Sequence, residues 1–145
     1  MSYHLRFLVT DPGPLDLDDL VTSLRAANRK YRLEVREGSG TLRLGTEVVG
    51  DIQLITQDDE AFEDQLAELE EAASEGSGRG EARVADALAT VQTIFAVAVS
   101  GQVQGRESLE SLDPVWEWLF DSREGLLQAD GEGYYDEEGL IFEVP

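Results

Sequence analysis

The sequence predicts an α+β fold: one domain over residues 1–145, in which helices pack on an antiparallel or mixed sheet. Some segments repeat their apolar residues at spacings of three and four, which is typical of a helix with one buried face. Others alternate apolar and polar residues, which is typical of a strand. The two kinds of segment are interleaved, and 41% of the 145 residues are hydrophobic. This content is sufficient for one substantial core.

The first third of the chain is expected to contain most of the strands. Leu5, Phe7 and Val9 share one face of the first strand, and Asp11-Pro-Gly-Pro14 ends it. A helix follows, with Asp16 or Asp18 as its N-cap and with apolar residues on one face. The strands expected in this part are Tyr3–Thr10, Tyr31–Glu37, Thr41–Leu44 and Val48–Thr56.

The middle of the chain holds its most apolar stretch, Glu81–Ser100. We expect a helix to Gln92 and then a strand over Ile94–Ser100, although the same apolar run is also compatible with a buried helix. An earlier helix, opened by a capping signal at Thr56–Asp59, is expected to face inward with Phe62, Leu66, Leu69 and Ala73. The glycine-rich segment 74–80 is predicted to be a flexible loop between the two helices.

The C-terminal part is expected to form a helix and a hairpin. The helix spans Ser108–Arg123, or begins only at Pro114, because proline is favoured at the first helical position. The hairpin joins Tyr134-Tyr135 to Leu140–Val144 through Asp136–Gly139. The element order is compatible with a split βαβ (ferredoxin-like) core, in which Ile94–Ser100 is the fourth strand and this helix and hairpin are appended.

Charge is the most unusual property of the chain. The net charge is −20: the residues through Arg43 include seven basic and six acidic ones, whereas those from Leu44 onward include four basic and 25 acidic ones. This balance argues against nucleic-acid binding and suits a basic protein partner, although acidity also serves solubility alone.

Several classes of protein are not expected. The chain has no cysteine, which excludes disulfides and thiolate metal sites. The N-terminus lacks the pattern of a signal peptide, so we expect a cytoplasmic protein. The apolar run is too short for a membrane span. We expect no cofactor, since the glycine-rich segment lacks the lysine and hydroxyl residue of a phosphate-binding loop.

Two groups of residues are candidates for catalysis or metal binding. His4 is the single histidine, and the sequence identifies no group that would orient it as a base. Carboxylates crowd the tail at Asp130, Glu132 and 136–138, and their oxygens would suit Ca²⁺ or Mg²⁺. A calcium loop counted from Asp130 would need glycine where Tyr135 stands, so that motif fails, and turn-forming residues explain the same composition.

The aromatic residues near the C-terminus predict a docking surface. Trp118 lies about 200° around the helix from Trp116, so it is expected to point outward. With Tyr134 and Tyr135 it would form an aromatic patch rimmed by Glu117, Asp121 and Asp136. In the alternative interpretation, the hairpin folds over Trp118 and buries it.

The segment Leu112–Leu140 resembles the C-terminal signature of small uncharacterised bacterial proteins. The resemblance is carried by Asp113-Pro114, Trp116–Phe120 and Gly125–Asp136, covers about a fifth of the chain, and implies no particular activity. In composition, the chain is also similar to immunity proteins that neutralise bacterial toxins.

We therefore predict a non-enzymatic protein-interaction module, for example an inhibitor of a basic partner. The alternative is a small-ligand or divalent-metal protein, or an enzyme, that uses the C-terminal carboxylates. A homodimer through the aromatic patch or an edge strand is a third hypothesis. The residues predicted to bind a partner are Trp118, Asp130, Glu132, Tyr134, Tyr135 and Asp136.

Overall fold

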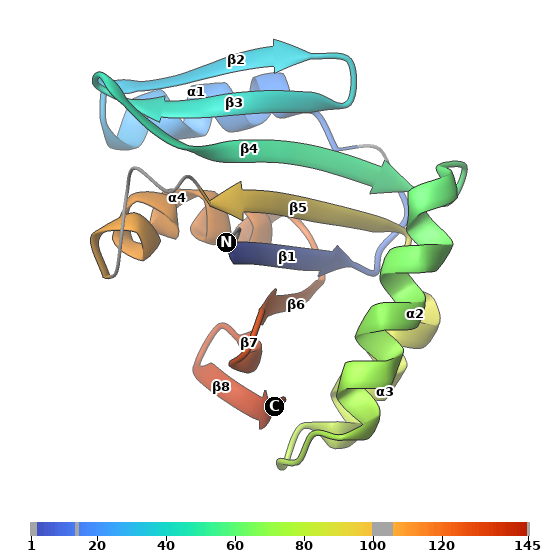
Figure 1. Cartoon of the computed structure of the whole chain (residues 1–145). Helices are drawn as coiled ribbons and strands as arrows, with labels where there is room; N and C mark the ends of the chain where they lie inside the picture. Colours follow the sequence, from blue (N-terminus) through green and yellow to red (C-terminus); the bar gives the residue numbers. More distant parts are fainter. Residues whose placement is uncertain (1–2, 14, 100–105, 145) are drawn as a thin grey trace.

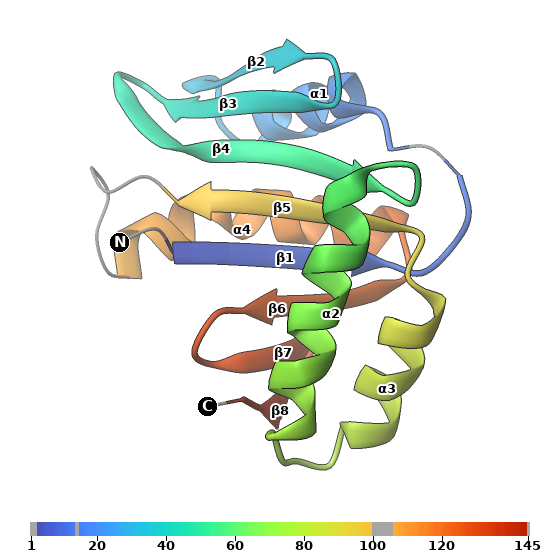
Figure 2. The ribbon, with the colours of Figure 1, turned by 45° about the vertical axis from the view of Figure 1, so that its right-hand side comes forward.

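Within the described part of the chain, eight antiparallel strands form one open sheet in the order β2-β3-β4-β5-β1-β6-β7-β8, which Figure 2 shows from one edge to the other. The computed structural model describes residues 3–13, 15–99 and 106–144. With four helices beside the sheet, the predicted α+β class is confirmed. The strands are β1 Tyr3–Val9, β2 Tyr31–Arg36, β3 Ser39–Leu44, β4 Glu47–Thr56, β5 Thr93–Val99, β6 Gly125–Ala129, β7 Gly133–Asp136 and β8 Gly139–Glu143.

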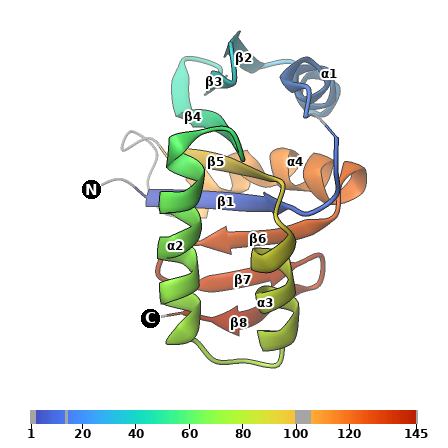
Figure 3. The same ribbon diagram turned by 90° about the vertical axis from the view of Figure 1, so that its right-hand side faces the viewer.

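The helices cover both faces of the sheet, so the molecule has three layers. On one face, α1 lies behind β2 to β4 and α4 lies behind β5 and β1 (Figure 1). On the other, α2 and α3 cross β1, β6, β7 and β8 (Figure 3). The helices are α1 Leu17–Ala27, α2 Glu60–Ser74, α3 Glu81–Thr90 and α4 Arg106–Ser122. No helix among the described residues is long and apolar enough to cross a membrane.

Two buried clusters follow from the alternation of side chains along the strands. Leu5, Phe7 and Val9 of β1 pack with α1 and α4, whereas Leu8 packs with α2 and α3. On the first side, the ring of Phe95 lies edge-on to that of Trp116, with centroids 6.2 Å apart. Because successive strand residues point to opposite faces, one strand contributes to both clusters.

The most apolar stretch of the sequence occupies the centre of this arrangement. α3 ends at Thr90, and β5 then runs between β4 and β1, so the strand interpretation of this region is the one found. Ile94 and Phe95 face opposite sides and are both fully buried. A strand that is apolar on both faces is stable only where both faces are covered, which favours this central position.

The strand order differs from that of a split βαβ core. In the split order, the first strand would separate the fourth from the third. Here β5, which corresponds to that fourth strand, itself lies between β4 and β1. The far side of β1 pairs with β6, so the C-terminal strands extend the sheet instead of being appended to it.

The start of α1 agrees with the sequence prediction, whereas α4 begins earlier than expected. Asp16 is the N-cap of α1, and its Oδ1 accepts from the amide of Asp18 at 2.9 Å. α4 begins at Arg106 and continues through Pro114, although proline removes a helical hydrogen bond. Near this proline, the Tyr31 hydroxyl donates to the carbonyl of Ser111 at 2.7 Å. This bond ties α4 to the edge strand β2.

The glycine-rich segment 74–80, predicted to be flexible, is hydrogen-bonded to the outer edge of β8. The amide of Ser77 donates to the carbonyl of Glu143 at 2.9 Å, and the amide of Glu143 donates back at 2.8 Å. The amide of Gly80 donates to Ile141 at 2.9 Å. A Cβ on Gly78 would collide with the β8 backbone, so glycine permits this close approach.

The predicted C-terminal hairpin is present as β7 and β8. Asp136 shapes its turn, because one carboxylate oxygen accepts from the amides of Glu138 at 2.8 Å and Gly139 at 3.1 Å. Gly139 has a φ of 134°, which favours glycine. The hairpin brings Asp136 and Glu137 close to α4 and α3.

Candidate functional site

The acidic residues of the tail lie at the two opposite ends of strand β7. Asp130 and Glu132 belong to the turn between β6 and β7, whereas Asp136 lies at the far end of β7. A strand advances about 3.3 Å per residue, so the two ends are on the order of 10 Å apart. The six residues predicted to bind a partner therefore do not form one surface.

The three predicted aromatic anchors are also separated. Tyr134 is buried against Phe142 on the α2 and α3 side, with 1% of its surface exposed. Tyr135 is half-buried and packs on the α1 and α4 side, since neighbouring strand residues alternate. Trp118 is half-buried and packs on this same side. Tyr134 therefore cannot serve as a surface anchor in this fold.

A groove does lie between α4 and the β7–β8 turn, with a volume of about 290 Å³. Aromatic surface comes from Trp116 and Phe120, and every other lining side chain is a carboxylate. Glu117, Asp121 and Asp136 line it together, as the sequence suggested, but around Trp116 and Phe120 instead of Trp118. We call it the acidic groove; its lining residues are Asp113, Trp116, Glu117, Phe120, Asp121, Asp136 and Glu137.

The charge of the acidic groove is not balanced by a basic residue in its own lining. Burial raises the pKa of Asp113, and the nearby carboxylates of Glu117 and Glu110 raise it further. This direction is typical of a site where negative charges repel one another. A cation placed in the groove would relieve that repulsion.

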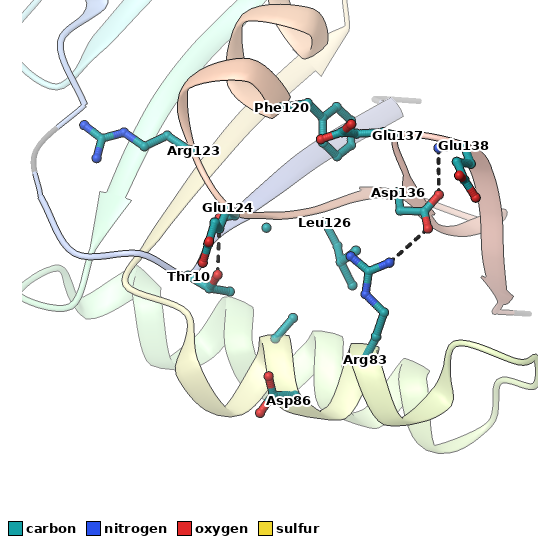
Figure 4. A pocket seen from close by; sticks show the side chains of 12 residues that line it. Thr10, Arg83, Asp86, Phe120, Arg123, Glu124, Leu126, Asp136, Glu137 and Glu138 are labelled. Atoms are coloured by element: carbon teal, nitrogen blue, oxygen red, sulfur yellow. Dashed lines mark hydrogen bonds and ion pairs between the residues drawn. The ribbon is translucent and has the colours of Figure 1, made fainter.

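A larger hollow of about 600 Å³ adjoins the acidic groove and shares Phe120, Asp136 and Glu137 with it. Figure 4 shows Arg83 of α3 reaching across this hollow to Asp136. The shortest distance between their charged groups is 2.9 Å. On the opposite side, Arg123 lies 3.5 Å from Asp11. Basic side chains thus line the larger hollow, and both are engaged with carboxylates.

A second polar cluster surrounds Arg6 on the α2 and α3 side of the sheet. Arg6 is only 7% exposed and donates from Nη1 to Asp130 at 2.7 Å and to Gln128 at 2.9 Å. Its Nε donates to Gln65 of α2 at 2.7 Å. The buried hydroxyl of Tyr134 has no hydrogen-bond partner among the described residues, and burial raises its pKa to about 12. The cluster joins β1, β6 and α2 and compensates a buried charge.

His4 lies at the margin of the Arg6 cluster. Its Nδ1 is 3.9 Å from Asp130 Oδ2, which is longer than a hydrogen bond. The other oxygen of Asp130 is held by Arg6 and Gln128. Asp130 is therefore committed mainly to Arg6.

The tail carboxylates do not converge as ligands in the described structure. Within 3–13, 15–99 and 106–144, no three His, Asp or Glu side chains are grouped so that they could hold a metal ion. Asp130 is occupied by Arg6, Asp136 by Arg83, and Glu132 accepts from the Tyr135 hydroxyl at 3.3 Å. These three carboxylates are therefore engaged with groups of the protein itself.

The sequence analysis missed residues of the acidic groove and of the cluster around Arg6. In α4, Asp113, Glu117 and Phe120 recur at spacings of four and three, so helical periodicity could have placed them on one stripe. Nothing local to Arg6 indicates its partner, because Arg6 and Asp130 are separated by 124 positions in the chain. The role of Arg83 was also missed, because its partner Asp136 is 53 positions away in the chain.

The chain was compared with protein-family models, with curated proteins and with solved structures, and none of them matches. The interpretation of the site therefore depends on its own geometry.

Proposed function

We propose that the protein is a non-enzymatic interaction module that binds a basic protein partner through the acidic groove. The observation that carries the proposal is the lining of the groove, whose described residues supply five carboxylates and two aromatic rings, with no basic side chain among them. Arginine side chains of a partner would find both charge and a flat apolar surface there. An inhibitor of a basic protein is one role that fits this chemistry.

The aromatic surface of the groove favours a side-chain binding site over a merely solvated acidic face. Trp116 is held in place by Phe95, and Phe120 packs edge-on against Phe7 with centroids 4.9 Å apart. Rings fixed by the core lose little freedom when a ligand stacks on them. An arginine guanidinium would therefore meet a preorganised surface.

The charge distribution supports the same partner class. Outside residues 17–44 the chain carries a net charge of −22, so a basic protein would be attracted from a distance. Attraction of this kind accelerates encounter, while the groove would determine where the partner binds. The tail carboxylates give less support to the alternative of metal binding. Most of them are bonded to other side chains or lie at opposite ends of β7.

The proposal is tested with a fluorescent oligo-arginine peptide as the probe. The Glu117→Gln/Glu137→Gln variant removes two exposed charges from the groove, and we expect it to weaken binding by about tenfold. The matched control, Glu63→Gln/Glu70→Gln, removes two exposed charges from α2 on the other face. It is expected to bind within about twofold of the unmodified protein.

Two results would count against the proposal. Equal weakening by both variants would mean that the peptide senses only the total charge. No measurable binding at low salt would remove the basic partner itself, because screening is then smallest.

A further inference from the structure

The two edge strands of the sheet, β8 and β2, differ in whether their outer side is covered. The outer edge of β8 is covered by the bridge between Ser77 and Glu143, whereas no segment among the described residues pairs with the outer side of β2 (Figures 1 and 2). Val35 of β2 is 42% exposed, which is high for a large apolar residue. An uncovered edge with apolar side chains is a template for a further strand.

The outward backbone groups of β2 are those of its odd-numbered residues, of which the Tyr31 amide already donates to the carbonyl of Asn28 at 3.2 Å. The amide of Gly45 donates to the carbonyl of Lys30, which places the even-numbered residues in the bonding pattern with β3. Because antiparallel pairing alternates, Leu33 and Val35 direct their amides and carbonyls away from β3. These groups are positioned to form a new ladder.

We propose that β2 pairs with β2 of a second copy of this chain, forming a symmetric dimer with a continuous sheet. An antiparallel pair of identical strands that keeps both faces aligned must be centred on one residue. Centring on Leu33 places Arg32 opposite the partner's Glu34, twice. On the other face, it places Tyr31 opposite the partner's Val35, also twice.

The charges of β2 favour this register over the next one. Centring on Glu34 would oppose three like-charged pairs, Glu34 with its copy once and Arg32 with the partner's Arg36 twice. Within one chain, Arg32 stands directly opposite Arg43 of β3 and has no ion pair within the described part of the chain. Glu34 of the second copy would place a negative charge opposite Arg32, in addition to its contact with Arg43 of its own chain at 3.5 Å.

The surroundings of β2 also suit self-association better than the rest of the surface. Residues 17–44 contain six basic and four acidic side chains, whereas the whole chain has a net charge of −20. Two copies therefore repel each other least where their β2 edges meet. The acidic groove is formed by α4 and the β7–β8 turn and does not include β2.

The test is sedimentation equilibrium of the full chain with four charge variants. The unmodified chain has a mass of 16.0 kDa, and we expect the dimer at high concentration. Arg32→Glu and Glu34→Arg should each weaken dimerisation by about tenfold, because two cross-strand pairs become like-charged. The double variant Arg32→Glu/Glu34→Arg should restore it. Arg36→Glu makes the same charge change, but faces the partner's Lys30 in this register and should not weaken the dimer.

Circular dichroism on each variant confirms that the fold is retained. A monomer at every concentration for the unmodified chain would overturn the proposal. A dimer that is insensitive to Arg32→Glu and Glu34→Arg would overturn it equally, because another surface would then form the contact.

Discussion

The guanidinium of Arg83 lies 2.9 Å from the carboxylate of Asp136, and this ion pair stands where the acidic groove meets the larger hollow. Arg83 comes from α3 and Asp136 from the β7–β8 hairpin, so the pair connects a helix to the sheet (Figure 4). It also supplies the basic charge nearest to that side of the acidic groove. The pair therefore limits the negative potential available to a ligand.

Replacing Arg83 with glutamine is expected to tighten oligo-arginine binding by about threefold, because Asp136 is no longer neutralised. The Arg83 side chain is 61% exposed, so the free energy of unfolding should change by less than about 1 kcal/mol. Fluorescence anisotropy and urea denaturation measure the two effects. Unchanged or weaker peptide binding would show that Asp136 does not contribute to the site.

Removal of the Asp130 carboxylate is expected to destabilise the fold. Asp130→Ala leaves the Arg6 guanidinium, which is 9% exposed, without its ion-pair partner, and we expect a loss of about 1–3 kcal/mol in urea denaturation. Arg6→Met/Asp130→Ala should recover part of that loss, since the uncompensated charge is gone. The control Glu138→Ala, at an exposed turn position, should stay within about 0.5 kcal/mol. Equal losses in Asp130→Ala and the control would contradict this role.

Tyr134 predicts a specific dependence of stability on pH. Burial raises its pKa from 10.0 to about 12, so the neutral phenol is favoured in the folded state. This contribution is fully present below pH 10 and is lost as the pH rises from 10 to 12. Tyr134→Phe should lose less stability than the unmodified chain between pH 9 and about pH 11.5. Because the hydroxyl has no hydrogen-bond partner in the part of the chain that the structure describes, the variant should be at least as stable near neutral pH.

That prediction is measured by urea denaturation at several pH values, with Tyr31→Phe for comparison. The Tyr31 hydroxyl donates to Ser111, so its removal should cost about 1 kcal/mol at neutral pH. A comparable neutral-pH loss in Tyr134→Phe would mean that its hydroxyl has a hydrogen-bond partner in solution.

Gly78 tests whether the segment 74–80 is fixed to β8. Gly78→Ala would place a Cβ 2.7 Å from the carbonyl oxygen of Ile141 at a φ of 150°, and we expect a loss of about 2–4 kcal/mol. Gly45 also has a positive φ, of 66°, but an added Cβ would meet nothing within 4 Å, so Gly45→Ala should cost only about 1 kcal/mol. Equal costs would indicate that the segment moves away from β8 in solution, and fast amide exchange at Ser77 would agree with that result.

The sequence was sufficient to predict the helices and strands that depend on local residue patterns. Periodicity located α2 and α3, and the alternation around Ile94 located β5, because burial of one face imposes these repeats. The position of β5 between β4 and β1 was not predicted, since strand neighbours are chosen by contacts distant in the chain. The pairing of Arg6 with Asp130 was missed for the same reason.

In the candidate site too, local patterns were predictable and contacts between distant segments were not. Period-two alternation in β7 separates Tyr134 from Tyr135, and that separation could have been derived from the hairpin alone. The meeting of Glu117 with Asp136 requires α4 to lie beside the β7–β8 turn, which no local signal specifies. Glu117, Asp121 and Asp136, which the sequence placed around an aromatic patch, line the groove, and its aromatic residues are Trp116 and Phe120 instead of Trp118.

The two tryptophans of the chain provide the most direct measurement of the central claim. Trp116 lines the acidic groove and Trp118 does not, so their indole N–H signals in a ¹H–¹⁵N NMR spectrum report the two positions separately. On titration with the oligo-arginine peptide at low salt, we predict that the Trp116 signal shifts together with the amides of Glu117 and Glu137. The Trp118 signal and the amides of α2 should move little. Shifts that concentrate on α2, or that leave Trp116 unchanged while the peptide binds, would contradict binding at the acidic groove.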